Sequence, residues 1–254
     1  MAFDYLVRLH LLKKYGGTEK TLIGCLPNVL SGVDERLLFR YTEPGLDFAG
    51  SIMQRRQLVV KGILDILDDR IIEDCLLIAN LEQSFRCGYF IPTDKFLLPR
   101  LRKNLKVLAK NWFPWESRYD HQPSVPSPLY LNATFGEASM AVGGADCDWI
   151  YGHVLYDLKT TKKLGYKGDD WAQVLGYAVL SEIEQGLPYK IDMVDIEYAR
   201  FNVSCHINTY QVPMIKEFRE RMKALVQMSR DEQEKEKERV ERMLNKIKTQ
   251  VNKK

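Results

Sequence analysis

The chain has 254 residues, of which 45% are hydrophobic and 28% are charged, and its formal net charge is +3. This size and apolar content support a full hydrophobic core, in one large α/β domain or in a core with helical additions. The apolar runs are only a few residues long, so we expect no transmembrane helix and no membrane partner. Residues 1–14 carry an acid and a histidine within their apolar stretch and include no small-residue cleavage site, which argues against a secretory signal.

Cysteine usage and charge distribution narrow the class of protein further. The five cysteines are scattered, with no C-x-x-C pair, as is typical of reduced thiols in a cytoplasmic protein. Residues 230–254 hold nine basic and six acidic residues, which accounts for the whole net charge. The rest of the chain is neutral overall, so any nucleic-acid surface there must be a local patch.

The first 110 residues are predicted to be mostly helical, interrupted by the turn-rich residues 41–50 and by Pro92. Within them, residues 63–86 have a strong helical pattern whose apolar stripe includes Glu82. An ionised carboxylate on an apolar face costs several kcal/mol unless it is paired or bound to a metal ion. Glu82 is therefore either a metal ligand or the partner of Arg86, one helical turn away.

A basic helix is predicted at residues 94–110, where six lysines and arginines accompany a single acid, Asp94. Leucines at helical spacing give it an apolar side. Its basic face, which includes Lys103 and Lys106, is either a contact for a nucleic-acid backbone or a solvated helix surface. Residues 111–134 are rich in proline and aromatic residues, which predicts an ordered connection or edge segment leading into the sheet.

The most informative segment is residues 143–162, GGADCDWIYGHVLYDLKTTK, within a sheet expected at about 139–160. It predicts two short strands joined by a turn at Gly152 and His153. Because strand side chains alternate between faces, Asp157 and Lys159 share one face of the second strand. The hairpin then brings Asp148 beside Asp157, with Lys159 one step along.

Two acids and a lysine that converge in this way indicate a metal site and chemistry on phosphate. Carboxylates hold a hard divalent cation through oxygen, and Mg²⁺ typically keeps several waters. A lysine beside the metal can steer the attacking water or stabilise the pentavalent transition state. The competing interpretation is a surface β-turn whose acids are simply solvated.

The hairpin is followed by a helix predicted at residues 170–185, with Gly186 as its C-terminal cap. Gln173 and Tyr177 are four residues apart and therefore share a face of this helix. Between hairpin and helix lie three lysines that are either phosphate contacts or a solvated basic loop: Lys162, Lys163 and Lys167.

The last part of the chain is predicted as one or two strands at residues 189–208 and one long helix at 212–254. Four distal apolar residues of that helix repeat at spacings suited to a short coiled-coil seam: Val240, Leu244, Ile247 and Val251. The seam indicates self-association or a partner protein, and a solvated helix is the alternative.

Three segments, GGADCDWI, LYDLKTT and WAQVLGY, together resemble the core of the PD-(D/E)XK nuclease superfamily in its RecB-like branch, over about residues 135–200. The resemblance implies that Asp148 and Asp157 bind Mg²⁺ or Mn²⁺, and that Lys159 orients or activates the attacking water. It also implies that Gln173 and Tyr177 lie on a helix that packs near the site and contacts nucleic acid. Some RecB-like nucleases carry a four-cysteine iron–sulfur cluster; this chain lacks the cysteine spacing, so no cluster is expected.

The third metal-binding acid is left open by the sequence. Glu82 is preferred over Glu137, which lies near the hairpin but in FGEAS, a segment predicted to be an irregular loop. Asp146 points to the same side as Asp148 and is either a supporting partner or the ligand itself. Asp148 is preferred because it directly precedes apolar strand residues, as the acid of the family does.

The sequence thus predicts an α/β fold with a restriction-endonuclease-like core, a mixed central sheet flanked by helices, at residues 111–211. A mostly helical part at 1–110 would pack on this core, and a charged helix at 212–254 would extend from it. The predicted function is a Mg²⁺-dependent deoxyribonuclease with DNA as its partner. The rival is a catalytically silent protein of the same fold that binds nucleic acid or protein.

Overall fold

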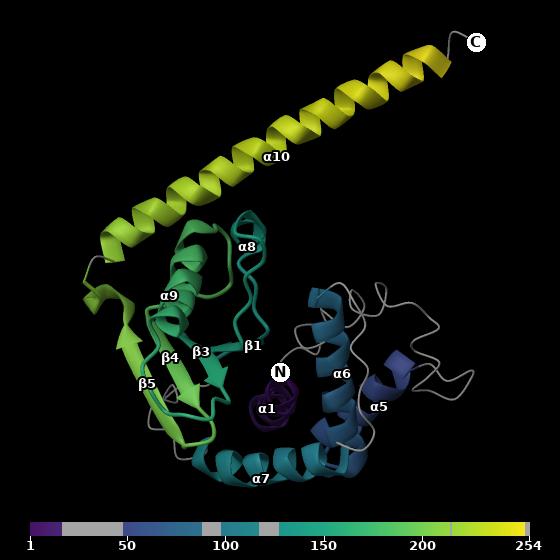
Figure 1. Ribbon diagram of the computed structural model, residues 1–254, viewed down its shortest axis with the longest axis vertical. Helices are drawn as coiled ribbons and strands as arrows, with labels where there is room; N and C mark the ends of the chain where they lie inside the picture. The colour runs from purple at the N-terminus through teal and green to yellow at the C-terminus, as the bar shows by residue number, and fades with distance from the viewer. Residues whose placement is uncertain (17–47, 88–97, 117–126, 214, 252–254) are drawn as a thin grey trace.

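A computed structural model describes residues 1–16, 48–87, 98–116, 127–213 and 215–251. These residues form a mixed α/β structure with a five-stranded sheet and a long C-terminal helix (Figure 1). The described α-helices are α1 (Ala2–Tyr15), α5 (Phe48–Val60), α6 (Asp69–Cys87), α7 (Leu98–Glu116), α8 (Gly136–Ala141), α9 (Gly168–Ile183) and α10 (Ile215–Val251). The strands are β1 (Leu129–Leu131), β2 (Trp149–Tyr151), β3 (Val154–Lys159), β4 (Met193–Tyr198) and β5 (Val203–Asn208).

The strands lie in the sheet in chain order, β1-β2-β3-β4-β5. The pair β3–β4 is parallel and the other three pairs are antiparallel. Parallel neighbours need a crossover connection, and α9 supplies it between β3 and β4. The expected mixed central sheet flanked by helices is therefore present.

The predicted hairpin is confirmed in its register and its turn. Tyr151 pairs with Val154 and Trp149 with Tyr156, so Gly152 and His153 form the two-residue turn. Gly152 has a φ of 63°, a conformation that a residue without a Cβ adopts at little cost.

The two faces of the sheet are covered by different helices. Trp149, Val154 and Tyr156 belong to a buried cluster with α1, α5, α6 and α7, whereas Ile150 and Leu155 belong to a second cluster with α8, α9 and α10. The predicted alternation is therefore correct. It places Asp157 and Lys159 on the α9 side of β3. Figure 1 shows α1 between the sheet and α6, so this helix has partners on both sides.

The described residues of the N-terminal part are mostly helical, as predicted, but two boundaries differ. The helix expected from residue 63 begins at Asp69, because Gly62 turns the chain with a φ of 72° and the carboxylate of Asp68 accepts the N–H of Arg70 at 2.9 Å. Helix α5 already includes residues 48–50, which were predicted as part of a turn, while 41–47 lie outside the described residues.

Residues 111–116 were expected to begin a connection, but α7 continues through Pro114 to Glu116. Pro114 has no N–H to donate to the carbonyl of Lys110 one turn earlier, so this last turn lacks one helical hydrogen bond. Trp112 stabilises this last part because its ring is fully buried against the sheet. The expected edge strand is present as β1, and residues 117–126 lie outside the described residues.

The segment before the hairpin was predicted as an irregular loop followed by a strand. It forms instead the short helix α8. The hydroxyl of Ser139 stabilises this helix by two hydrogen bonds of 2.7 Å: the hydroxyl accepts from the N–H of Phe135 and donates to the carbonyl of Ala145. The first strand of the hairpin, β2, consequently begins at Trp149 rather than near residue 139, and the backbone of Asp146 forms an isolated bridge with that of Thr134.

Helix α9 ends at Ile183 with Glu184 as its C-cap, so the predicted cap at Gly186 is wrong. Gly186 has a φ of 84° in the turn that follows. Residues 189–208 contain the two strands β4 and β5, as one of the predicted alternatives had it.

The first part of α10 packs against α8 and α9, and the side chains of residues 231–243 are all exposed. Residues 231–251 form a stretch of helix about 30 Å long. Figure 1 shows this end of α10 extending away from the sheet. Val240 of the predicted seam is exposed, and the side chains of its other three residues lie outside the described part. None of the described helices is long and apolar enough to span a membrane.

Candidate active site

The predicted site residues meet where β3 ends and β2 begins. Asp148 directly precedes β2, and Asp157 and Lys159 lie in the last half of β3. The backbone N–H of Leu158 donates to Oδ2 of Asp148 at 2.6 Å, which fixes Asp148 beside Asp157. The hairpin therefore brings the two acids together as the sequence indicated.

Arg8 is a member of this site that the sequence reasoning missed. Its guanidinium lies 3.3 Å from Oδ1 of Asp148, and it also donates to Asp4 at 2.9 Å and to Asn132 at 2.7 Å. Arg8 and Asp4 both lie on α1, and both side chains are buried. The signal was an acid and an arginine, four residues apart, inside the apolar stretch of residues 1–14.

Asn132 links the end of β1 to the same cluster. Its φ of 50° is in the left-handed region, which asparagine tolerates better than most residues. In this conformation its N–H donates to the carbonyl of Asp148 at 2.9 Å, while its side-chain oxygen accepts from Arg8. Both the backbone and the side chain of Asp148 are thereby held in place.

Lys159 lies between two carboxylates. Its Nζ is 2.8 Å from Oδ2 of Asp157 and 3.7 Å from Oδ1 of Asp170, the latter on the first turn of α9. The Oδ2 atoms of Asp157 and Asp170 are both buried and accept no hydrogen bond of normal geometry from the described residues. Oδ2 of Asp157 thus has Lys159 as its ion-pair partner, and the buried Oδ2 of Asp170 has capacity for a further donor.

The ionisation of these groups is set by their burial and mutual charge. Burial, and then the charge of Asp148, raise the pKa of Asp157 to about 6, against the opposing effect of Lys159. Burial lowers the pKa of Lys159, but the carboxylates of Asp157 and Asp170 outweigh this and leave the pKa above its ordinary value. Lys159 is therefore a cation at neutral pH.

Gln173 and Tyr177 continue the network along α9. Nζ of Lys159 donates to Oε1 of Gln173 at 3.1 Å, and Nε2 of Gln173 donates to the hydroxyl of Tyr177 at 2.7 Å. The ring of Tyr177 stacks on Phe135, with 5.6 Å between ring centroids. The structure thus brings the predicted helix pair to the predicted lysine.

The three candidates for a third acid lie in different surroundings. Glu82 accepts the hydroxyl of Tyr5 at 2.7 Å, and the ring of Tyr5 lies 5.4 Å from the guanidinium of Arg8. Glu137 lies instead toward α10, 3.7 Å from Arg230. No three His, Cys, Asp or Glu side chains among the described residues are grouped closely enough to hold one ion. The choice of Glu82, Glu137 or Asp146 stays a prediction, and the side chain of Arg86 lies outside the described part.

Asp148 and Asp157 nevertheless suit a hard divalent cation. Mg²⁺ is commonly held by one or two carboxylates and completes its shell with waters and substrate phosphate. Asp157 contributes a buried oxygen with no normal hydrogen bond, and Asp148 lies beside it with partial exposure. The donor set therefore fits Mg²⁺ or Mn²⁺ as a two-carboxylate site.

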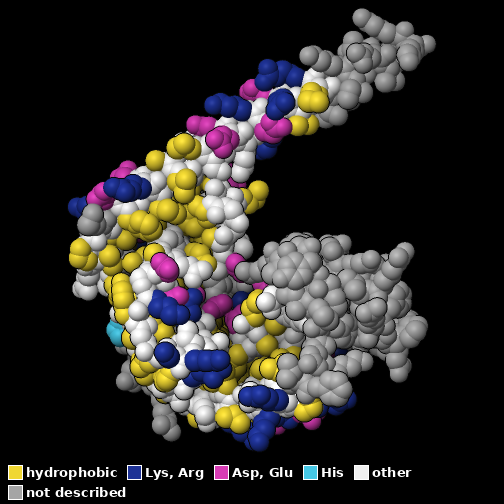
Figure 2. All heavy atoms as spheres, viewed as in Figure 1, with side chains coloured by type: hydrophobic (Ala, Val, Ile, Leu, Met, Phe, Trp, Pro, Cys, Tyr) yellow, Lys and Arg dark blue, Asp and Glu magenta, His cyan; other side chains and the backbone are white. Residues whose placement is uncertain are grey.

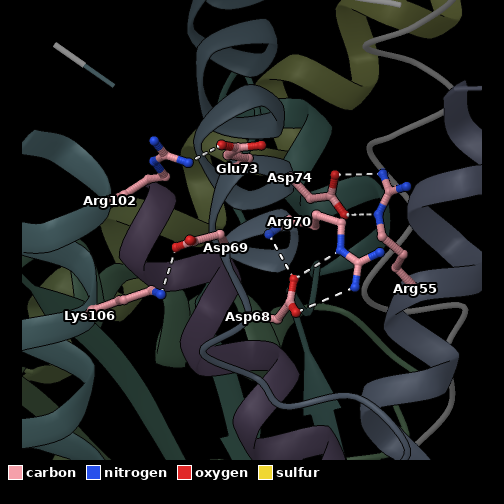
Figure 3. Close-up of polar contacts among 8 residues, drawn as sticks. All are labelled: Arg55, Asp68, Asp69, Arg70, Glu73, Asp74, Arg102 and Lys106. Atoms are coloured by element: carbon pink, nitrogen blue, oxygen red, sulfur yellow. Dashed lines mark hydrogen bonds and ion pairs between the residues drawn. The ribbon is translucent and has the colours of Figure 1, made fainter. Parts of the chain in front are cut away.

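The predicted basic surfaces differ in how far ion pairs with acidic residues neutralise their charges. Lys162 and Lys163 are exposed in the loop directly after β3, and Lys103 is exposed on α7. Lys106, by contrast, pairs with Asp69 at 2.6 Å, and Arg102 with Glu73 at 2.5 Å (Figure 3). Acids of α6 therefore neutralise part of the basic face predicted for residues 94–110.

Figure 2 shows acidic and basic side chains together where this face of the molecule is hollowed, between the sheet and the N-terminal helices. No family model, curated protein or solved structure matches the chain.

Proposed function

We propose that this chain is a metal-dependent nuclease of the PD-(D/E)XK superfamily, RecB-like branch, which hydrolyses phosphodiester bonds of DNA. The observation that carries the proposal is the meeting of Asp148, Asp157 and a charged Lys159 at one end of the mixed sheet. Burying two acids and a lysine together is costly, and phosphodiester hydrolysis is a reaction that uses this set.

The residues have complementary roles in that reaction. A Mg²⁺ or Mn²⁺ ion held by Asp148 and Asp157 supplies charge neutralisation at the phosphate and a more acidic water. Lys159, as a cation, stabilises negative charge on the attacked phosphate and orients the water. It does not act as a free amine base, because its pKa is raised by the acids around it.

Gln173 and Tyr177 are positioning residues for Lys159. Lys159 has three hydrogens on Nζ, and its carboxylate partners and Gln173 determine their directions. Tyr177 in turn fixes the amide of Gln173. The network aligns the ammonium group before the substrate arrives, which lowers the reorganisation that the reaction requires.

One observation favours the rival function, a catalytically silent protein that binds nucleic acid or protein. The guanidinium of Arg8 contacts Oδ1 of Asp148, and Leu158 occupies Oδ2, so both oxygens of this acid already have partners. A permanent arginine cation in this place would substitute for the metal electrostatically. In that case α10, whose residues 231–243 are all exposed, is the element available for a partner.

Two measurements on the same samples separate these functions. The first is cleavage of linear and circular DNA, single- and double-stranded, with Mg²⁺, Mn²⁺ or EDTA, by wild type, Asp157→Asn, Lys159→Ala and the control Lys61→Ala, which changes an exposed lysine after α5. The second is Mn²⁺ binding by calorimetry. The nuclease requires metal-dependent cleavage that both site variants abolish and the control retains. Cleavage that survives in both site variants, or absence of both cleavage and Mn²⁺ binding in wild type, refutes it.

A further inference from the structure

The loop at residues 160–167, between β3 and α9, presents an aromatic ring and several cations to solvent directly after Lys159. Tyr166 is 80% exposed, which is more than any other large hydrophobic or aromatic side chain reported among the described residues. Lys162, Lys163 and Lys167 are exposed on the same loop. A single exposed tyrosine is ordinary, but a ring among three lysines beside the candidate active site is a specific combination.

This loop is held by side-chain hydrogen bonds to its backbone. Arg200 donates to the carbonyl of Thr160 at 2.9 Å, Tyr198 donates to that of Gly165 at 3.4 Å, and Thr161 donates to that of Lys163 at 3.0 Å. Tyr198 is the last residue of β4, which pairs in parallel with β3. The loop is therefore anchored to the end of the sheet that carries Asp157, while its own side chains point outward.

The turn after β4 adds to the same surface. Arg200, which contacts Thr160, is exposed, and Phe201 beside it is also partly exposed. The exposed charges of the loop and this turn are four cations, and one exposed acid, Asp169, follows at the start of α9. The surface is thus cationic and carries two accessible aromatic rings.

We propose that this loop is a binding platform for single-stranded DNA, on which an unpaired base stacks against Tyr166 while Lys162, Lys163 and Lys167 contact the phosphates on either side. Alternating aromatic and cationic contacts suit a single strand, because a duplex keeps its base faces covered by their neighbours. The inference rests on the proposed function in that it identifies the substrate class of the same site. It directs a single strand, or the frayed end of a duplex, to Asp148, Asp157 and Lys159.

Binding can be measured apart from cleavage. Fluorescence anisotropy with labelled dT20 and with a labelled 20-base-pair duplex, both in EDTA, compares wild type, Tyr166→Ala and Tyr166→Phe. The control is Tyr210→Ala: Tyr210 is 57% exposed and follows β5 at the opposite end of the sheet from Lys159. The surface positions allow each variant to fold, and circular dichroism verifies this.

Because Tyr166→Ala removes the ring on which one base stacks, the variant should bind dT20 about 5- to 100-fold more weakly than wild type. Its affinity for the duplex should change little. Tyr166→Phe and Tyr210→Ala should bind dT20 as wild type does. Replacing the three lysines by glutamine should lower the slope of log affinity against log salt by about 2, since each single-strand phosphate contact contributes about 0.7.

The outcomes separate this inference from the proposed function. Wild type that binds no dT20, or Tyr166→Ala that binds it as tightly as wild type, overturns the platform even if the chain cleaves DNA. An equal loss for dT20 and the duplex also overturns it. Selective loss in Tyr166→Ala supports the platform even if no cleavage is found, in which case the nuclease proposal alone fails.

Discussion

Replacing Arg8 by methionine tests whether the buried charges around Asp148 form one interdependent unit. The arginine side chain is only 6% exposed and contacts Asp4, Asn132 and Asp148. Removing it leaves the buried carboxyl group of Asp4 without its cation, and burial already raises the pKa of Asp4 despite that cation, so the variant must either bury an unpaired charge or take up a proton. Breaking a buried pair on one side typically costs about 3–5 kcal/mol, so we expect a loss of this size.

The chain offers two controls for this prediction. Arg102→Met removes a surface ion pair with Glu73, in which the arginine is 30% exposed, and should cost no more than about 1 kcal/mol. The double variant Asp4→Leu with Arg8→Met removes both charges of the buried pair. It should lie within about 2 kcal/mol of wild type, because Asp148 keeps the N–H of Leu158 and access to water.

The assay is urea unfolding at pH 7 followed by circular dichroism, with the free energy extrapolated to water. A cost below about 1 kcal/mol for Arg8→Met would mean that water or a rearranged side chain replaces the guanidinium. A double variant less stable than Arg8→Met alone would refute the reasoning more directly, because it would show that Asp4 stabilises the fold without its partner.

Three other predictions follow from the site and from α10. In metal-free buffer, Asp157→Asn should gain stability relative to wild type, by on the order of 3 kcal/mol, between pH 4 and pH 7. The sign follows because the pKa of Asp157 in the folded state, about 6, lies above its ordinary value of 3.8. The stability that Asp157 contributes is therefore full below pH 4 and is lost as the carboxyl group ionises. A stability difference between variant and wild type that is constant or falls from pH 4 to pH 7 would contradict this prediction. Gln173→Ala should slow cleavage about 10-fold, and more than Tyr177→Phe, because Gln173 contacts Lys159 directly and Tyr177 does so only through Gln173; single-turnover rates check the order. Deleting residues 231–254 should change the melting temperature by no more than about 2 °C, since the side chains of 231–243 contact solvent; a larger fall in a thermal scan would indicate that the distal helix packs on the protein.

The hairpin was predictable because its signal is local. Alternation in VLYDLK fixes which side chains share a face, and the two-residue turn fixes the register with the preceding strand. The same local reasoning gave the i, i+4 pair Gln173 and Tyr177. In these two cases neighbours in the sequence determine the contact, and the predicted contact is present.

Contacts between distant segments were not predictable in this way. Nothing near Asp148 in the sequence indicates that Arg8 is its partner, and nothing in the basic segment 94–110 indicates that acids of α6 pair with Arg102 and Lys106. Helix α8 was missed for a related reason, since the hydroxyl of Ser139 closes it through hydrogen bonds that no periodicity reveals.

The placement of α1 has a consequence for folding during synthesis. Arg8 and Asp148 touch although 140 residues separate them, and at about 5–20 residues per second the ribosome needs roughly 7–28 s to make the intervening chain. Throughout that time the apolar side chains of α1 have the other N-terminal helices but no sheet to pack on. The early and late parts of the polypeptide therefore meet at the charged cluster itself, and the site can be assembled only after β2 and β3 have been made.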